Sequence, residues 1–147
     1  MIYEKTIGDY LFSVDKQKLQ LDAIHHYLSV ESYWAQNIPI ELVKKTIEGS
    51  VCFGVFHNGK QIGFARVITD HASFGYLADV YILEQHRKQG LSKELMKFIM
   101  TYPDFEKFRR FMLATRDAHG LYKQFGFRSL NEPDRFMELK PFEKYPV

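Results

Sequence analysis

Residues 82–92 read Ile82-Leu83-Glu84-Gln85-His86-Arg87-Lys88-Gln89-Gly90-Leu91-Ser92. The stretch leaves a β-rich run that ends at Leu83 and crosses a short polar loop. After Gly90 it enters a segment whose apolar residues recur at helical spacing. Backbone N–H groups at a helix N-terminus, backed by the positive end of the helix dipole, form a seat for phosphate. The stretch therefore predicts a strand, a loop and a helix that together bind a phosphorylated ligand.

Two common glycine motifs for phosphate binding are absent from the chain. The dinucleotide fingerprint G-x-G-x-x-G does not occur. The P-loop G-x-x-x-x-G-K-[ST] is also missing, because Gly90 has Lys93 three residues on but no upstream glycine at the required spacing. What remains is the pattern R-x-x-G-x-S, formed by Arg87, Gly90 and Ser92.

Outward from this loop, strand-like and helix-like patterns alternate along the chain. The expected strands are residues 9–14, 50–57, 61–69, 76–83, 111–115, 127–130 and 136–139, and the expected helices are residues 19–35, 39–48, 91–102 and 117–125. Asn58-Gly59 predicts a tight hairpin turn, and Asp15 and Asp117 are expected to cap the helices that follow them. This order predicts an α/β (α+β) fold with a mixed sheet and helices on its faces.

Composition limits the kinds of function that are open to the chain. Its 147 residues fit one domain, and a net charge of +2 is too mild to indicate nucleic-acid binding. The single cysteine, Cys52, excludes an internal disulfide and a cysteine-based metal site. His25-His26 lack a further ligand at metal-binding spacing, so no metal is expected. Without a membrane-spanning run or a signal core, the expected location is the cytoplasm, with no membrane partner.

Three segments resemble the GNAT superfamily of N-acetyltransferases. Residues 87–92 are similar to the family motif [QR]-x-x-G-x-[GA], which follows a strand and opens a helix. Asp79-Val80-Tyr81-Ile82 resembles the family's fourth strand, and residues 118–127 resemble its A-x-x-L-Y-x-x-x-G-F segment. The resemblance implies one domain over residues 1–147, with a mixed, mostly antiparallel central sheet of about six to seven strands flanked by about four helices.

The chain departs from the family pattern at three positions. Ser92 replaces the usual glycine or alanine but is small enough to leave the helix start close to a phosphate. Lys88 stands where a second glycine is common. Thr115 stands where the family often has asparagine, which puts in doubt the contact that this asparagine would make to the cofactor.

The ligand that the resemblance implies is acetyl-coenzyme A. Its pyrophosphate would bind the backbone N–H groups from Arg87 through Lys88, Gln89, Gly90 and Leu91 to Ser92. Gly90 would let the backbone approach closely, and the side chains of Arg87 and Lys88 would add partly solvated cationic attraction. The pantetheine arm would pair like a short strand with the backbone of Ile82, Leu83 and Glu84, at a point where neighbouring strands separate.

Direct attack of an amine on the thioester requires a neutral amine, a donor to the oxyanion and a proton for the leaving thiolate. Tyr122 matches the family's tyrosine and is the expected general acid and a cofactor contact, although it could instead be a core residue beside Phe125 and Phe127. Asp79 is the candidate base, since strict alternation places it with Leu77 and Tyr81 on one face of the strand. It could equally be a structural hydrogen-bond acceptor.

Glu84 and His119 are further candidates for the base, and either could simply be solvated. The resemblance implies that a backbone N–H near Ile82 is the oxyanion donor. Tyr33, Trp34 and Asn37 could line the acceptor site.

The function expected from these observations is the transfer of acetyl from acetyl-CoA to a primary amine on a small molecule or a protein. A non-catalytic sensor that binds acyl-CoA is one alternative. A phosphate- or RNA-binding module that uses Arg87, Lys88 and Phe108-Arg109-Arg110 is another. No nucleic acid is expected as a partner of the enzyme, and an exposed late strand could pair two copies as a homodimer.

Overall fold

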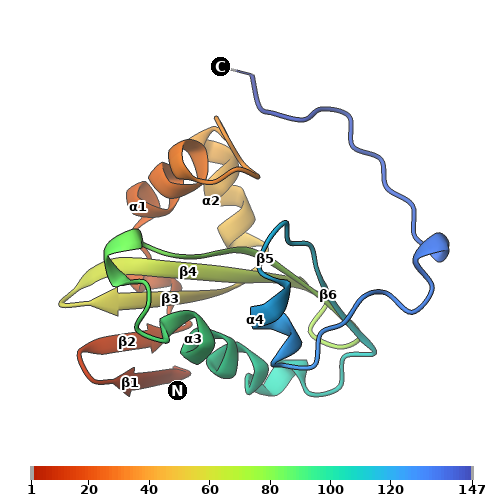
Figure 1. Cartoon of the computed structure of the whole chain (residues 1–147). Coiled ribbons are helices and arrows are strands. Elements are labelled where there is room, and N and C mark those ends of the chain that lie inside the picture. Colours follow the sequence, from red (N-terminus) through yellow and green to blue (C-terminus); the bar gives the residue numbers. More distant parts are fainter. Residues whose placement is uncertain (1, 147) are drawn as a thin grey trace.

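Six strands form one sheet in the computed structural model, which describes residues 2–146. The strands are β1 (Glu4–Ile7), β2 (Tyr10–Ser13), β3 (Val51–His57), β4 (Lys60–Thr69), β5 (Phe74–Ile82) and β6 (Arg110–Leu113), and they lie in the sheet in that order (Figure 1). Neighbours from β1 to β5 are antiparallel, and β6 is parallel to β5. The predicted mixed, mostly antiparallel sheet is therefore confirmed. The first strand was not expected, because its residues are mostly exposed and carry no hydrophobic pattern.

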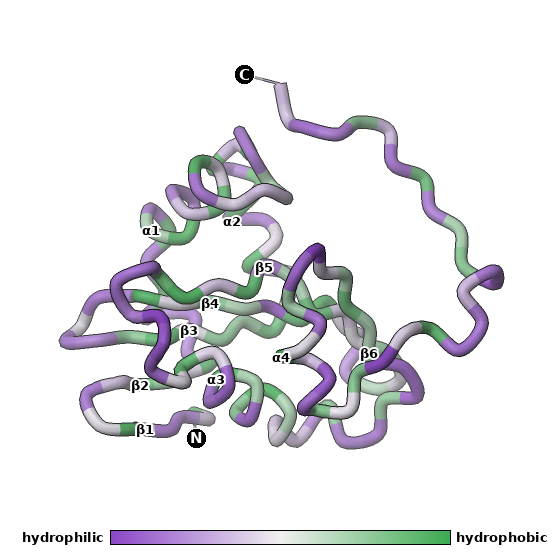
Figure 2. The backbone as a smooth tube through the Cα atoms, in the orientation of Figure 1, coloured by the Kyte–Doolittle hydropathy of each residue, from purple (hydrophilic) through white to green (hydrophobic). Residues whose placement is uncertain are grey.

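Helices cover both faces of the sheet (Figure 1). The helices are α1 (Leu21–His26), which continues into a π-helical turn η2 (Tyr27–Glu31), α2 (Ile40–Glu48), α3 (Leu91–Met100) and α4 (His119–Lys123). Two hydrophobic clusters result, one between the sheet and α1 and α2, the other between the sheet and α3 and α4. Figure 2 shows the hydrophobic residues concentrated along the central strands between these layers. The strands β3 and β4 are buried on both faces, which explains their nearly continuous apolar sequence.

Neither expected cap is confirmed: Asp15 caps a different element, and Asp117 is not the cap of its helix. Asp15 caps a 3-10 turn, η1 (Lys16–Lys18), by accepting a hydrogen bond from the Gln17 N–H, and the chain is extended at Gln20 before α1 begins. The cap residue of α4 is Ala118 in place of Asp117. Its N–H donates to the Thr115 hydroxyl over 3.0 Å, so Thr115 stabilises the turn that leads into α4.

The two late strands expected at residues 127–130 and 136–139 are wrong. After α4, the described residues form no strand and only one short 3-10 turn, η5 (Pro133–Arg135). Residues 131–146, here called the C-terminal arm, leave the body of the molecule and arch back toward α2 (Figure 1). Met137 and Leu139 are exposed, so in a single copy these apolar side chains have no surface to pack on.

A β-bulge interrupts β5 at Asp79. Phe64 of β4 pairs with Tyr81, and Arg66 pairs with Ala78, so Ala65 alone faces both Asp79 and Val80. Asp79 has φ 55°, a left-handed conformation that aspartate tolerates better than most residues.

The extra residue makes the expected shared face of β5 wrong. Leu77 packs in the cluster beneath α3, whereas Tyr81 packs in the cluster beneath α1. The Asp79 side chain points to the side of α1 and α2, where it contacts Arg66 and Trp34. The physical reason is that one additional residue inverts the in-and-out alternation of everything that follows it.

The strands β5 and β6 separate partway along their length. They pair from Phe74 with Arg110 as far as Leu77 with Leu113, while β5 continues to Ile82. Among the described residues, no strand pairs beyond Leu77 with the edge of β5 that faces β6, although β4 pairs with the opposite edge as far as Ile82. This separation leaves a gap at the edge of the sheet, with β5 on one side and α4 on the other.

Candidate active site

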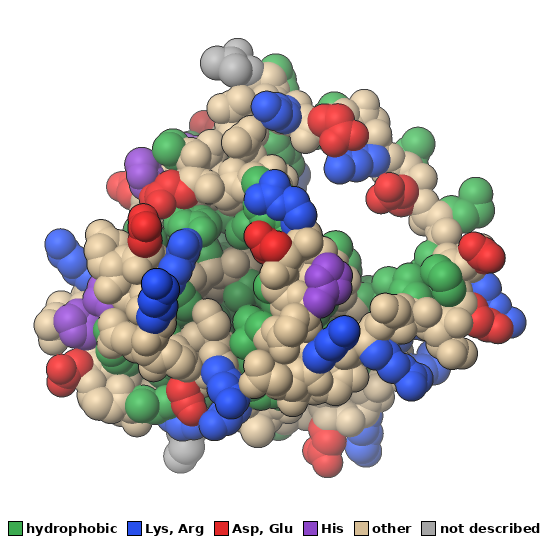
Figure 3. All heavy atoms as spheres, in the orientation of Figure 1, with side chains coloured by type: hydrophobic (Ala, Val, Ile, Leu, Met, Phe, Trp, Pro, Cys, Tyr) green, Lys and Arg blue, Asp and Glu red, His purple; other side chains and the backbone are tan. Residues whose placement is uncertain are grey.

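A cleft of about 630 Å³ lies where β5 and β6 separate. Its walls come from the segment between α1 and α2, from β4 and β5, from the connection between β6 and α4, from α4, and from the C-terminal arm. The residues that line it are Tyr33, Trp34, Ala35, Ile38, Thr46, Arg66, Tyr76, Leu77, Ala78, Asp79, Val80, Leu113, Ala114, Thr115, Arg116, Asp117, Ala118, Tyr122 and Tyr145. Figure 3 shows hydrophobic side chains in the hollow between α1 and α4, with charged side chains around its rim. The cleft can therefore admit a ligand that carries both apolar and polar groups.

The N-terminus of α3 is open to an incoming anion. Lys88 has φ 63° and Gly90 has φ 77°, so two left-handed residues turn the chain into the helix. No side chain caps α3, and a Cβ atom built at Gly90 would meet no other atom within 4 Å. Since the first N–H groups of a helix have no partner inside it, these groups are available to phosphate oxygens.

Arg87 is exposed, but its guanidinium already has partners within the chain. Its Nε donates to the Ile82 carbonyl over 2.9 Å, and a terminal nitrogen donates to the Tyr27 hydroxyl over 3.1 Å. The Tyr27 ring stacks on Tyr81, with 3.9 Å between centroids. Arg87 thus fastens the loop to the end of β5 and to η2. Among the described residues no acidic side chain pairs with Lys88, which leaves that ammonium as the cation of the loop available to a ligand.

Most backbone groups at the end of β5 already have partners. The Leu83 N–H donates to the Ile62 carbonyl over 2.8 Å, and the carbonyls of Leu83 and Glu84 accept from His86 and Arg87. Successive residues of a strand direct their backbone groups to opposite edges. Because the Leu83 N–H faces β4, the Ile82 N–H faces the open edge. Of the three residues expected to pair with pantetheine, Ile82 is therefore the one that presents a backbone donor to the opening.

Tyr122 reaches the cleft from α4. Its side chain packs against Phe127, with ring centroids 6.1 Å apart, and the residue is only 8% exposed. Burial raises the pKa of the Tyr122 phenol to about 12. The hydroxyl makes no hydrogen bond to another residue that the structure describes, and it keeps its proton at neutral pH. It is therefore a proton donor whose partner has to come from outside the chain.

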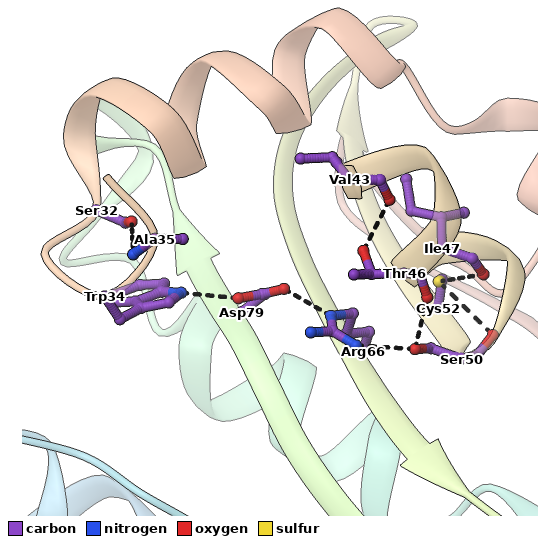
Figure 4. A network of polar contacts seen from close by, with 10 residues as sticks. All are labelled: Ser32, Trp34, Ala35, Val43, Thr46, Ile47, Ser50, Cys52, Arg66 and Asp79. Carbon is purple, nitrogen blue, oxygen red and sulfur yellow. Dashed lines mark hydrogen bonds and ion pairs between the residues drawn. The ribbon is translucent and has the colours of Figure 1, made fainter. Parts of the chain in front are cut away.

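Asp79 is held at both carboxylate oxygens (Figure 4). Oδ1 accepts from the Trp34 indole N–H over 2.7 Å, and Oδ2 accepts from Arg66 Nε over 2.6 Å. The side chains of Asp79 and Arg66 are 9% and 13% exposed. A second nitrogen of Arg66 donates to the Ser50 hydroxyl over 3.0 Å. This geometry favours the structural alternative for Asp79, because both of its carboxylate oxygens already accept hydrogen bonds from side chains of the cleft wall.

The other two candidates for the base lie outside the cleft. Glu84 is exposed in the 3-10 turn η3 (Glu84–His86), beside a separate hollow between α1 and β5. His119 is exposed at the start of α4 and lines a groove next to β6. The structure thus brings Tyr122 and Asp79 to one cleft and keeps Glu84 and His119 away from it.

Three residues of the cleft were missed by the sequence analysis. Arg66 is a charged residue inside an otherwise buried strand, and that exception was the available signal that it has a buried partner. Arg116 contacts Tyr33 twice. The Arg116 guanidinium lies 3.8 Å from the centre of the Tyr33 ring, and the Arg116 backbone N–H donates to the Tyr33 hydroxyl. Tyr145 comes from the C-terminal arm, and no local pattern indicates that it returns to the body.

Two findings bear on metals and membranes. Within residues 2–146, no group of three or more histidine, cysteine, aspartate or glutamate side chains is arranged to hold a metal ion. None of the helices in that range is both long enough and apolar enough to cross a bilayer.

Comparison with known proteins identifies the class. A family model described as the acetyltransferase (GNAT) family matches residues 21–127. The chain therefore belongs to the GNAT family of acetyltransferases, and it is an acyltransferase.

Individual relatives agree with this class. The crystal structure of a candidate GNAT acetyltransferase from Xanthomonas campestris pv. campestris has 45% identical residues and a TM-score of 0.89, with 92% of this chain and 95% of that chain covered. A candidate acetyltransferase of Gibberella zeae is 34% identical over 88% of this chain and 85% of its own length. A Clostridium acetobutylicum protein crystallised with acetyl-CoA shares the fold, with a TM-score of 0.65 and 18% identity over 89% of this chain and 94% of that one.

Proposed function

We propose that the chain transfers an acetyl group from acetyl-coenzyme A to a primary amine by direct attack. The observation that carries this proposal is the open edge of β5, which connects two sites. One end lies in the cleft at Ala78 to Val80, beside Tyr122. The other end leads through the loop at Leu83 to the uncapped N-terminus of α3. A ligand with a phosphate group, an extended amide arm and a thioester matches, in that order, the N-terminus of α3, the open edge of β5 and the cleft.

The coenzyme would bind by its pyrophosphate at the start of α3. The N–H groups from Lys88 to Ser92 would donate to the phosphate oxygens, since the Arg87 N–H already donates to the Glu84 carbonyl, and Lys88 would supply the positive charge. Arg87 would hold the loop in place through Ile82 and Tyr27 without meeting the ligand directly. The amides of the pantetheine arm would then run along the open edge of β5, where the Ile82 N–H faces outward.

The chemistry needs a donor at the oxyanion and a proton for the thiolate. We assign the first role to a backbone N–H at the open edge of β5, near Ile82. We assign the second to the Tyr122 phenol, whose pKa of about 12 keeps it protonated throughout the neutral range. The nitrogen lone pair of the amine attacks the thioester carbonyl and forms the C–N bond. Collapse of the tetrahedral intermediate then breaks the C–S bond, and the thiolate takes the Tyr122 proton. The extra proton that the nitrogen carries after attack passes to water in the cleft, and Tyr122 regains a proton from that water.

Asp79 acts in this proposal as a positioning residue. Its contacts to Trp34 and Arg66 hold the wall of the cleft opposite α4, where the amine would enter. The amine would lose its proton to water that reaches the cleft. The acceptor site would lie among Tyr33, Trp34 and Tyr145, which line the side of the cleft nearest α1 and α2.

The test combines ligand binding with turnover. Acetyl-CoA at a hundred times its Kd should add about 2.7 kcal/mol of apparent stability, which is measured as a higher midpoint of thermal denaturation. A panel of primary amines should then release free thiol from acetyl-CoA faster than a control without amine. A thermal shift without thiol release from any amine would instead support the non-catalytic sensor. Neither a shift nor release would contradict the proposal and leave the phosphate-binding alternative.

A further inference from the structure

The cleft contains one buried ion pair and two charged side chains that have no partner. Arg66 and Asp79 neutralise each other across 2.6 Å in the cleft wall (Figure 4). Arg116 and Asp117 are exposed neighbours in the connection between β6 and α4, and both line the cleft. Among the described residues, no oppositely charged side chain lies within 4.0 Å of either one. The cleft therefore offers a ligand one cation and one anion at adjacent positions.

Tyr33 holds Arg116 in place. The guanidinium lies 3.8 Å from the centre of the Tyr33 ring, and the Arg116 backbone N–H donates to the Tyr33 hydroxyl over 3.0 Å. Tyr33 in turn packs edge-on against Trp34, with 5.0 Å between ring centroids. Stacking occupies one face of a guanidinium and leaves the N–H donors at its edge free. Arg116 is therefore preorganised to bind an anion, and a carboxylate accepts two of these donors at once.

This pair of charges lies next to the proposed proton donor. Burial is the main cause of the raised pKa of the Tyr122 phenol, and electrostatic effects of Tyr33 and then of Asp117 add to it. Because the interaction of two charges weakens with their separation, both groups lie near the phenol. Tyr122, Tyr33 and Asp117 also line the same cleft. An amine that attacks the thioester beside Tyr122 would therefore place the rest of its molecule near Arg116.

We propose that the acetyl acceptor is an amine that also carries a carboxylate, such as a free amino acid, and that Arg116 binds this carboxylate. The inference rests on the proposed acetyl transfer and adds the class of acceptor to it. The carboxylate would accept hydrogen bonds from the edge of the guanidinium, and Asp117 would attract the ammonium group before it loses its proton. The apolar part of the acceptor would pack on Trp34, whose side chain is 39% exposed at the cleft.

Other classes of amine match these charges less well. A simple amine or a polyamine would bring its ammonium group to the unpaired guanidinium of Arg116, and like charges repel. An amine that carries a phosphate could also bind a guanidinium. Its phosphate has up to two negative charges, however, and Asp117 would repel it more strongly than it repels a single carboxylate. The carboxylate is therefore the anion that this cleft favours.

The first test compares matched acceptors by the release of free thiol from acetyl-CoA. The panel holds the common α-amino acids and β-alanine, each with its amide and its decarboxylated amine, together with O-phosphoethanolamine. For the best amino acid, kcat/KM should exceed that of its amide and of its amine at least about tenfold. The amide is a stringent control, because loss of the carboxylate lowers the pKa of the amine and by itself favours attack.

The outcomes of this test separate the inference from the proposed function. If amides or decarboxylated amines react as fast as the amino acids, the acetyl transfer stands and the inference is overturned. Faster reaction of O-phosphoethanolamine than of β-alanine would also overturn it, since the preferred anion would then be phosphate. If no amine of any kind releases thiol, the proposed function fails, and the inference that rests on it fails too.

The second test assigns the preference to Arg116. Arg116→Gln should raise KM for the amino acid at least about tenfold, with little change in kcat, in acetyl-CoA affinity or in the KM of the amide. Arg116→Lys keeps the charge but loses the planar fork, so it should recover only part of the loss. Arg128→Gln makes the same change at an exposed arginine that does not line the cleft, and it should leave KM unchanged. An unaltered KM for the amino acid in folded Arg116→Gln protein would overturn the role of Arg116.

Discussion

At the scale of single residues, Tyr122 is the group on which the proposed chemistry depends most. Tyr122→Phe keeps the ring that packs against Phe127 and removes only the hydroxyl. We expect kcat to fall by roughly 10²-fold with little change in acetyl-CoA binding, since general acid catalysis is typically worth that much. Steady-state kinetics and a binding titration measure the two quantities. Wild-type turnover in the Phe variant would remove Tyr122 from the mechanism.

The raised pKa of Tyr122 also sets an expectation for pH. The phenol gains burial on folding, so its ionisation is disfavoured in the native state and its pKa lies at about 12, above the ordinary value of 10. The stability linked to this group is present below pH 10 and is lost as the pH rises through the folded-state pKa. Activity should therefore not fall from loss of the Tyr122 proton anywhere in the neutral or mildly alkaline range.

Lys88 is the second residue with a separable role. Lys88→Gln should weaken acetyl-CoA binding by roughly fivefold at low salt, because one exposed cation beside a phosphate at a helix N-terminus contributes a modest, screened attraction. Lys60→Gln, a matched loss of charge at the hairpin between β3 and β4, should leave the affinity unchanged. Isothermal titration at two salt concentrations provides the comparison. An equal loss of acetyl-CoA affinity in both variants would mean that the loss comes from the change in net charge and from no local contact of Lys88.

At the scale of elements, the contacts of Asp79 join three segments of the chain. The ion pair with Arg66 bridges β4 and β5, and the hydrogen bond from Trp34 attaches the segment between α1 and α2. Asp79→Asn should lower the free energy of unfolding by about 3 kcal/mol, because it leaves a largely buried guanidinium without a counter-charge. Asparagine accepts the left-handed backbone, so strain does not confuse the result. Denaturant unfolding of the single variant gives the value.

A double variant separates positioning from proton transfer. Adding Arg66→Gln to Asp79→Asn removes both charges and should recover part of the lost stability. If Asp79 only positions the wall, the pH profile of kcat/KM should keep its shape in the Asp79→Asn variant. Loss of the acidic limb of that profile would instead identify Asp79 as the base.

Elements with local signals were predicted well from the sequence. The β3–β4 hairpin has its Asn58-Gly59 turn, α2 follows Pro39, and α3 begins directly after Gly90. Elements without such local signals were not predicted from the sequence. The strand β1 is short and polar, and the bulge at Asp79 depends on how β5 aligns with β4, which no stretch of a single strand reveals. Residues 136–139 have a clear strand pattern but no neighbour in one copy, so propensity alone does not make a strand there.

At the scale of the whole molecule, the order of the elements predicted the sheet but not the cleft. Tyr122 and Asp79 could be named because each belongs to a recognisable segment. The cleft between them requires β5 and β6 to part, and its far wall requires the arm to return with Tyr145. Contacts such as Arg116 against Tyr33 link residues 83 positions apart. Information of this kind lies in the three-dimensional arrangement, and periodicity along the chain does not carry it.

The bulge at Asp79 has a consequence for how β5 can change over evolutionary time. By inserting one residue opposite Ala65, it reverses the parity of the strand, so that Leu77 serves the layer under α3 and Tyr81 serves the layer under α1. Removing Asp79 would leave a regular strand in the same register, with Tyr81 still opposite Phe64 and Ile82 still opposite Gly63. It would, however, delete the carboxylate that joins Trp34 to Arg66, and with it the contacts that hold the wall of the cleft. Insertions and deletions should consequently accumulate in the loops of this protein and spare its fifth strand.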